Sequence, residues 1–192
     1  MSESQKRTRR SGAETRAQIL RVAMQLFTDK GFDATTTRDI ANALGMNQSS
    51  LYYHFASKDE IVTSLVAQRR RDLDTFVAWL ADQPRTSGLL RSAALRWLDT
   101  TTPEHLHAMR LALASPTVQH RLVGGDLDVR SAFDRVIGHF VDSETAADEQ
   151  IRIRMVFDTV SAALLSAHGT NADSTAILTA ARRATLMLTR EA

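Results

Sequence analysis

Cysteine is absent from the 192 residues, and proline and glycine are scarce, with 3 and 8 copies. Without cysteine, neither a disulfide framework nor a thiolate metal site can form, and a reducing compartment is expected. No apolar run reaches the length of a bilayer span, and no apolar stretch follows the basic N-terminus, which rules against a membrane helix and a signal peptide. We therefore expect a cytoplasmic chain with no membrane partner. The remaining composition, 43% hydrophobic and 24% charged, is that of a globular protein.

Charge is distributed unevenly along the chain. Residues 1–58 carry nine Lys and Arg against five Asp and Glu, whereas residues 59–192 carry fifteen against seventeen. A basic end favours a polyanionic partner, although a solvated basic tail gives the same count. The run KRTRR, Lys6 to Arg10, can be interpreted in two ways. It is either a disordered tail or an arm that enters a DNA minor groove beside the main contact.

Helical periodicity dominates the sequence, and no segment alternates as a β-strand does. Ser11 and Glu14 have the spacing of a capping box at the start of a helix that ends at Lys30, directly before Gly31. Similar signals mark the other segments. The predicted helices cover residues 11–30, 36–45, 47–54, 57–81, 88–99, 104–114, 117–123, 127–141, 148–168 and 174–190.

The fourth predicted helix begins at another capping box, Ser57 with Glu60, and carries apolar residues towards both ends. Its middle, AQRRRD over residues 67–72, interrupts the apolar stripe. A helix that is hydrated in the middle and buried at both ends suits a connector between two packed units. We predict an all-α fold of about nine helices. Residues 1–58 would form a basic arm and a helix-turn-helix domain, residues 59–192 a larger helical domain, and helix 58–81 the connector.

The stretch NQSSLYYHFASKDE, residues 47–60, is poor in aliphatic side chains and rich in hydrogen-bonding ones. Gly45, Met46 and Asn47 join the second and third helices, which is the length and chemistry of a helix-turn-helix whose second helix enters the major groove. In the third helix of the chain and the residue that follows it, only Leu51 and Phe55 are needed for the core. The other side chains are available to DNA: Gln48, Ser49 and Ser50 for base edges or phosphates, and Tyr52, Tyr53, His54 and Lys58 for phosphates.

The segment GFDATTTRDIANALGMNQSSLYYHFASKDEIV, residues 31–62, resembles the tetracycline-repressor-like (TetR) family of transcriptional regulators. The shared features are a glycine after helix one, threonines opening helix two, an Ile-Ala pair, a glycine turn, Leu-Tyr-x-His-Phe and a Ser-Lys cap. The resemblance covers the first quarter to third of the chain and implies double-stranded DNA with a palindromic operator as the partner. Where many relatives have Lys then Gly, this chain has Gln48 and Ser49, which weakens the expected phosphate attraction there. The DNA contacts implied by the resemblance are Thr37, Arg38, Gln48, Ser49, Ser50, Tyr52, Tyr53, His54 and Lys58.

No local motif is present beyond residue 85, and the expectations for this part come from the resemblance. It implies an all-α domain that binds a small-molecule effector and dimerises through the last two long helices. Helices 148–168 and 174–190 have apolar and alanine-rich faces that fit a homodimer, because helix-turn-helix proteins read palindromes as dimers. The same faces could instead complete the core of one chain.

Large apolar residues of this region are candidates for an effector site, since such cavities are mostly apolar. Ordinary core packing is the alternative, because aromatic residues dominate cores. No acid, base or cation stands out as an effector-recognition group, so the effector is expected to be largely apolar. The candidates are Trp79, Trp97, Met109, Phe133 and Phe157, with Phe140 beside them.

The sequence contains no catalytic motif and no phosphate-binding glycine loop. His139 and Asp142 share a helical face, but no third ligand is near, so we expect no metal site, no cofactor and no enzyme activity. The function indicated is a homodimeric, sequence-specific transcriptional regulator: a repressor that a small-molecule effector releases from its operator. The alternatives are an activator of the same family, and an architectural or interaction module that keeps the helix-turn-helix as a scaffold.

Overall fold

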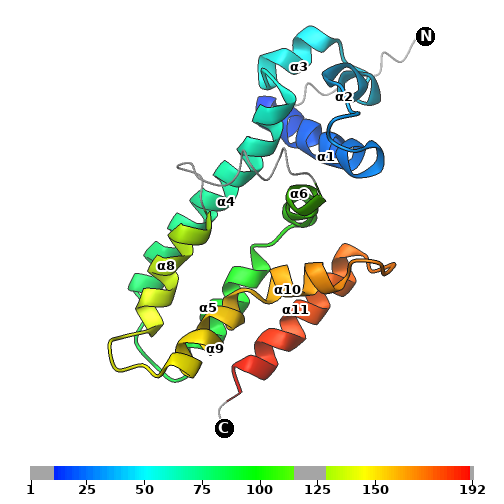
Figure 1. Cartoon of the computed structure of the whole chain (residues 1–192). Helices are drawn as coiled ribbons and strands as arrows, with labels where there is room; N and C mark the ends of the chain where they lie inside the picture. The colour runs from blue at the N-terminus through cyan, green and yellow to red at the C-terminus, as the bar shows by residue number, and fades with distance from the viewer. Residues whose placement is uncertain (1–10, 115–128, 191–192) are drawn as a thin grey trace, which may run out of the picture. The chain divides into compact units, whose positions relative to one another are not determined.

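The computed structural model describes residues 11–114 and 129–190, which form ten helices and no β-strand (Figure 1). The chain divides into two compact units, residues 1–61 and 62–192. The prediction of an all-α fold is confirmed, and these described residues contain ten helices because one of the nine predicted ranges that fall within them is divided in two. The predicted helix over residues 117–123 and the basic run from Lys6 to Arg10 lie outside the described residues.

The first unit consists of α1 (Gly12–Lys30), α2 (Thr37–Ala43), α3 (Gln48–His54) and the first turn of α4 (Lys58–Ala81). Helix α2 packs against both α1 and α3. Each helix contributes apolar residues at helical spacing to one core, which excludes water from the centre of the unit. The buried residues are Ile19, Ala23, Met24, Phe27, Phe32, Ile40, Ala41, Leu51, Phe55 and Ile61.

Side-chain caps fix where α1 and α2 begin. The Ser11 hydroxyl accepts a hydrogen bond from the Glu14 N–H at 3.2 Å, and the Glu14 carboxylate accepts one from the Ser11 N–H at 2.8 Å. Thr36 and Asp39 form the same reciprocal arrangement at the start of α2. Hydrogen bonds from Thr36, and then the Lys30 ammonium 3.9 Å away, hold the pKa of Asp39 below its usual value. Asp39 therefore stays ionised at neutral pH, which stabilises the N-terminus of α2.

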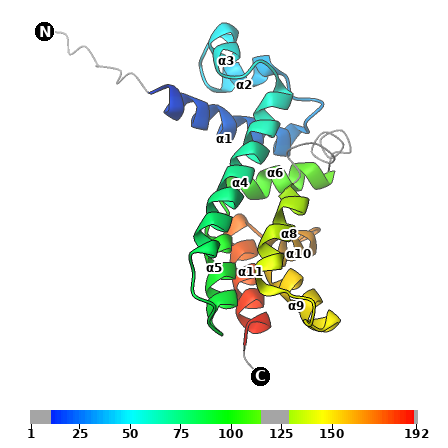
Figure 2. The same cartoon turned by 90° about the vertical axis from the view of Figure 1, so that its left-hand side faces the viewer.

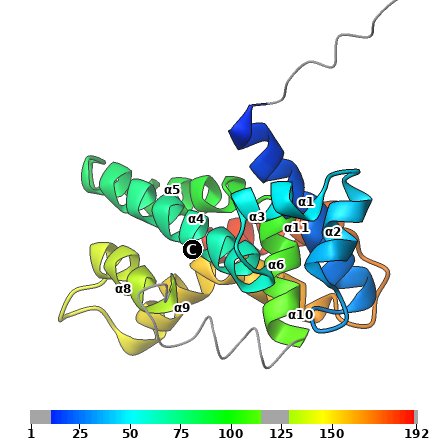
Figure 3. The ribbon, with the colours of Figure 1, turned by 90° about the horizontal axis from the view of Figure 1, so that it is seen from above.

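The second unit contains the rest of α4 and six further described helices. They are α5 (Leu89–Asp99), α6 (Pro103–Ala114), α8 (Val129–Phe140), α9 (Ala147–Phe157), α10 (Thr159–Ser166) and α11 (Ser174–Leu188). Helix α11 packs against α5, α9 and α10 (Figure 2), and α10 also packs against α6 (Figure 3). None of the helices in the described ranges has both the length and the apolar character needed to cross a membrane.

The prediction of one continuous helix over residues 148–168 is wrong, because two helices, α9 and α10, cover this range and are separated at Asp158. Asp158 has φ −98° and ψ 7°, outside the helical pattern on either side. The next residue, Thr159, is buried, and its hydroxyl lies 2.9 Å from the Thr185 hydroxyl of α11. This buried hydrogen bond between α10 and α11 holds Thr159 against α11, directly after the break at Asp158.

Candidate nucleic-acid interface

Helix α3 is short and carries most of its side chains on the surface. It begins at Asn47, whose side-chain oxygen accepts a hydrogen bond from the Ser50 N–H at 2.7 Å. Gly45 in the preceding turn has φ +62°, a conformation that residues with a Cβ rarely adopt. Of the seven residues in α3, only Leu51 is buried. The helix therefore contributes little of its surface to the core, and its outer side remains available to a partner.

Three side chains from α2 and α3 form a hydrogen-bonded group, which we call the polar triad: Thr37, Gln48 and Tyr52. Gln48 Nε2 lies 3.2 Å from Thr37 Oγ1 and 3.3 Å from the Tyr52 hydroxyl oxygen. The two hydroxyl oxygens are themselves 3.3 Å apart. Because Thr37 opens α2 and Gln48 opens α3, the polar triad ties together the first turns of the two helices.

Four further predicted DNA contacts are exposed on the same two helices: Arg38, Ser49, Ser50 and Tyr53. Tyr53 is 87% exposed, so its ring contributes little to the core of the chain. None of the four side chains has a hydrogen-bond or ion-pair partner in the part of the chain that the structure describes. His54 is half-buried, and its ring meets that of Tyr53 edge to face at 5.2 Å between centroids.

Lys58, the ninth predicted contact, is held by the connection between α1 and α2. Its ammonium donates a hydrogen bond to the Phe32 carbonyl at 2.7 Å and lies 4.6 Å from the centroid of the Phe32 ring. The structure thus places eight of the predicted residues on α2 and α3 and the ninth at the start of α4. Lys58 therefore helps to hold the first unit together, and contact with a phosphate remains its predicted role.

Arg16 on α1 was not predicted, although it holds the C-terminal end of α3. Its guanidinium donates to the His54 carbonyl, lies 3.8 Å from the centroid of the Phe55 ring, and is 3.9 Å from a carboxylate oxygen of Glu60. Glu60 in turn accepts a hydrogen bond from the Ala56 N–H at 2.6 Å. A cation at the carboxyl end of a helix compensates its unpaired carbonyls and its dipole. We call this group the Arg16 clamp.

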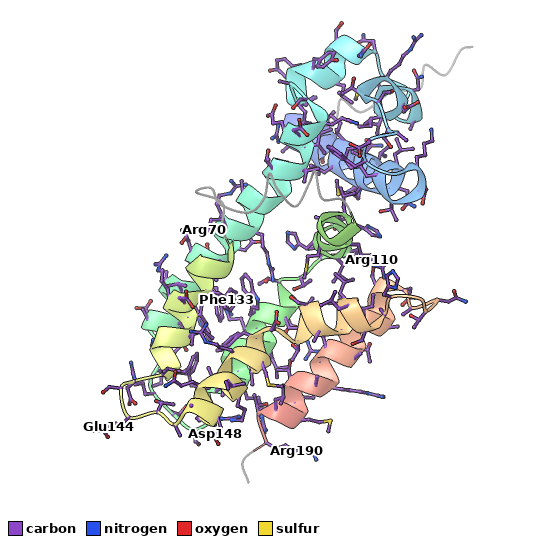
Figure 4. The ribbon with its side chains drawn as sticks, in the orientation of Figure 1. Arg70, Arg110, Phe133, Glu144, Asp148 and Arg190 are labelled. Atoms are coloured by element: carbon purple, nitrogen blue, oxygen red, sulfur yellow. The ribbon has the colours of Figure 1, made fainter. Side chains whose placement is uncertain are left out.

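The predicted effector residues are divided between two clusters of the second unit. Trp97 and Phe133 have ring centroids 5.1 Å apart, and Phe133 and Phe157 5.6 Å apart, so these three rings pack together. Phe133, which is central to this group, is labelled in Figure 4. Trp79 packs against the same cluster, whereas Met109 packs against a separate one. A shallow open groove lies elsewhere, on the outer face of α5, lined by Ser92, Leu95, Arg96, Asp99 and Thr100.

A half-buried cation beside Trp97 was also not predicted. The Arg69 guanidinium lies 3.6 Å from the centroid of the Trp97 ring and donates hydrogen bonds to the hydroxyls of Thr100 and Thr101, at 2.7 and 3.1 Å. Burial lowers the pKa of Arg69 to about 10, so it is still charged at neutral pH. Only the fold reveals this group, because Arg69 stands in a run of three arginines that is otherwise typical of a solvated helix face.

His105 is buried beside Arg69 and Asp72, with its Nε2 atom 4.0 Å from an Asp72 oxygen. Burial, and then the positive charge of Arg69, lower the pKa of His105, while Asp72 and Glu104 act in the opposite direction. The folded chain therefore favours neutral His105. Burial and then the charge of Arg85 lower the pKa of His139 in the same direction.

We expect stability to fall as the pH drops below about 6.5, the usual pKa of an unfolded histidine. Below pH 6.5 the unfolded chain binds a proton at His105, whereas the folded chain does not. Above pH 6.5 His105 is neutral in both states. The His105→Gln variant should lose this part of the pH dependence, which is at most about 1.4 kcal/mol per pH unit. Urea denaturation at pH 7.5 and pH 5.5 measures it. If the free energy of unfolding changes equally with pH in the wild type and in the variant, His105 is not the source of the pH dependence.

Comparisons with known proteins agree with this arrangement. Residues 19–65 match the family model described as bacterial regulatory proteins, tetR family, a span that includes all of α2 and α3. The HTH-type transcriptional repressor KstR2 of Rhodococcus jostii is 38% identical over 99 residues, which is 52% of this chain and 47% of that protein. The chain spans about half, or less, of the length of the curated relatives it matches.

Solved structures extend the similarity to nearly the whole chain. A TetR-like regulator from Rhodococcus sp. RHA1 has a TM-score of 0.63 at 23% identity, covering 94% of this chain and 96% of its own. SmeT, in a complex with triclosan, has a TM-score of 0.61 at 20% identity, covering 91% of this chain and 90% of its own. At such identities these structures establish the fold alone. The fold of both units is therefore that of known regulators.

Proposed function

We propose that this chain, which belongs to the TetR family of bacterial regulatory proteins, is a sequence-specific DNA-binding regulator that represses transcription from a palindromic operator. The observation that carries the proposal is the outer side of α3, where six of seven residues are left off the core in a unit that is otherwise well packed. The match to a family of regulators also supports the expectation that the chain is not an enzyme.

In this proposal residues 1–58 read the DNA. The first turn of α3, with Gln48, Ser49 and Ser50, faces base edges in the major groove, as first-turn residues of recognition helices do. Arg38 and Tyr53, which are exposed and have no hydrogen-bond or ion-pair partner in the described residues, reach phosphates, and so do His54 and Lys58. The phosphate contacts set the register of the helix, and the base contacts supply the sequence preference.

Residues 59–192 supply dimerisation in the same proposal. Large apolar side chains remain exposed on the last three helices: Ile151 and Met155 on α9, Leu165 on α10, and Leu186 and Met187 on α11. Apolar surface gathered on neighbouring helices is the usual mark of a protein interface. A second copy of the chain, related by a two-fold axis, would cover it and place two α3 helices on a palindrome.

Regulators of this family bind DNA operators and small-molecule effectors. We propose that the effector of this chain is largely apolar and contacts the aromatic residues of the second unit. The solved complex of SmeT with triclosan, in a protein of similar fold, supports a small-molecule effector. Release from the operator requires that the effector bind more tightly to the dimer geometry that cannot bind DNA.

Selection of bound fragments from genomic DNA by the purified protein tests the proposed function. We expect a small number of promoter regions to be enriched, each with a palindrome. Transcription from an enriched promoter, with and without the chain, then separates repression from activation. If no fragment is enriched over random DNA, the scaffold alternative takes the place of the regulator.

Lys58 provides a separate test of the proposed phosphate contacts. The Lys58→Ala variant should weaken specific and nonspecific binding alike, and reduce the slope of log K against log salt by about one unit for each phosphate that is no longer neutralised. Arg21→Ala, which removes an exposed cation of α1 that has no hydrogen-bond or ion-pair partner in the described residues, is the matched control and should keep the slope. An altered base preference with an unchanged slope would show that Lys58 does not contact phosphate.

A further inference from the structure

We propose that the polar triad acts as one recognition element, in which Thr37 and Tyr52 hold the Gln48 amide so that its Oε1 atom faces the DNA. In this orientation Gln48 accepts a hydrogen bond from a base amino group, either N6 of adenine or N4 of cytosine. The inference rests on the proposed function, because it requires that α3 enter the major groove. It makes Thr37 and Tyr52 positioning residues for base recognition rather than phosphate contacts.

Proton counting determines the orientation of the amide. The triad has three contacts of 3.2 to 3.3 Å, and each needs one proton. A glutamine amide carries two protons on Nε2, and each hydroxyl carries one. With Nε2 turned towards Thr37 and Tyr52, the two amide protons fill two contacts and one hydroxyl proton fills the third.

The flipped amide fails the same count. If Oε1 faced Thr37 and Tyr52, both hydroxyl protons would be used on Oε1. The contact between the two hydroxyl oxygens, at 3.3 Å, would then hold no proton and would bring lone pairs together. Hydrogen-bond networks assign amide orientation, and this network is satisfied in one orientation only. Gln48 Oε1 is therefore the atom of the amide that is left for a partner.

This orientation changes which bases Gln48 can recognise. A freely rotating glutamine pairs with adenine through one donor and one acceptor. Within the polar triad both amide protons are engaged, so Gln48 offers an acceptor only. In the major groove adenine and cytosine present amino donors, whereas guanine and thymine present oxygen acceptors at the corresponding edge. We expect one position in each half-site that accepts adenine or cytosine and rejects guanine and thymine by roughly tenfold or more.

Binding-site selection from random DNA, run on wild type and on Tyr52→Phe, tests the proposal. Tyr52→Phe removes one hydroxyl of the triad and frees the amide to donate as well as to accept, so guanine and thymine should be bound to within about twofold of cytosine at that single position. Other positions should keep their preferences. Tyr53→Phe is the matched control, because it removes a hydroxyl that has no partner in the described residues, one position along the same helix. It should leave the preference at every position unchanged.

The outcomes separate this inference from the proposed function. If wild type enriches no motif, the proposed function fails. If wild type enriches a motif that Tyr52→Phe reproduces at every position, with equal or uniformly weaker affinity, the triad is not a recognition element and the regulator stands. Thr37→Val is the second variant, since the N-cap of α2 is Thr36 and is preserved. It should relax the same position as Tyr52→Phe, and relaxation elsewhere would overturn the proposal.

Discussion

Met187→Asp should convert the protein from a dimer to a monomer and weaken operator binding by about a hundredfold or more. Met187 on α11 is 68% exposed beside Leu186, and in the proposed dimer both are covered by the partner. An aspartate there would have to lose its hydration without a paired charge, which is strongly unfavourable. Two recognition helices that are no longer linked lose the effective concentration that linkage supplies, commonly a factor of 10² to 10⁴. Sedimentation velocity and operator titration measure the two effects.

The control for this variant is Ser87→Asp, which adds the same charge at an exposed position between α4 and α5. It should remain a dimer with unchanged affinity. If Met187→Asp also remains a dimer and binds the operator as wild type does, the last helices are not the interface.

Arg16→Met should loosen α3 while the rest of the chain keeps its fold. The variant removes a charged donor from the His54 carbonyl and a cation from the Phe55 ring, which together destabilise α3 by about 2 kcal/mol. The ion pair with Glu60 contributes little, because both side chains are about 40% exposed. Hydrogen exchange of the α3 amides should become roughly thirtyfold faster, which is the same free energy expressed as a rate ratio. Operator affinity should fall with it.

Arg21→Met is the matched control for the Arg16 clamp. Arg21 is exposed on the same helix and has no partner in the described ranges. Its replacement should leave exchange in α3 unchanged. Equal exchange rates in the two variants would mean that Arg16 does not position α3.

Local signals were sufficient to predict most of the first unit. Ser11 with Glu14 and the Asn47 cap are interactions across three residues, so the sequence alone displays both partners and fixes where α1 and α3 begin. The glycine turn and the two core residues Leu51 and Phe55 follow from the same short range. Such features predict a helix-turn-helix because its determinants lie close together in the chain.

Interactions between distant residues account for what was missed. The contact between Arg16 and His54 spans 38 residues, and the one between Thr159 and Thr185 spans 26. Neither pair carries a local pattern, so the Arg16 clamp and the break at Asp158 were not predictable. The sequence likewise identified Thr37, Gln48 and Tyr52 as polar surface residues but contained no sign that they bond to one another.

The most direct test of the central claim compares the affinity of the purified chain for one enriched palindromic fragment with its affinity for the same fragment with scrambled half-sites. Both affinities are measured at one salt concentration, since binding to DNA depends strongly on salt. We expect two chains per duplex and a preference of at least about a thousandfold for the palindrome. A preference near one would contradict the claim that this chain reads DNA sequence.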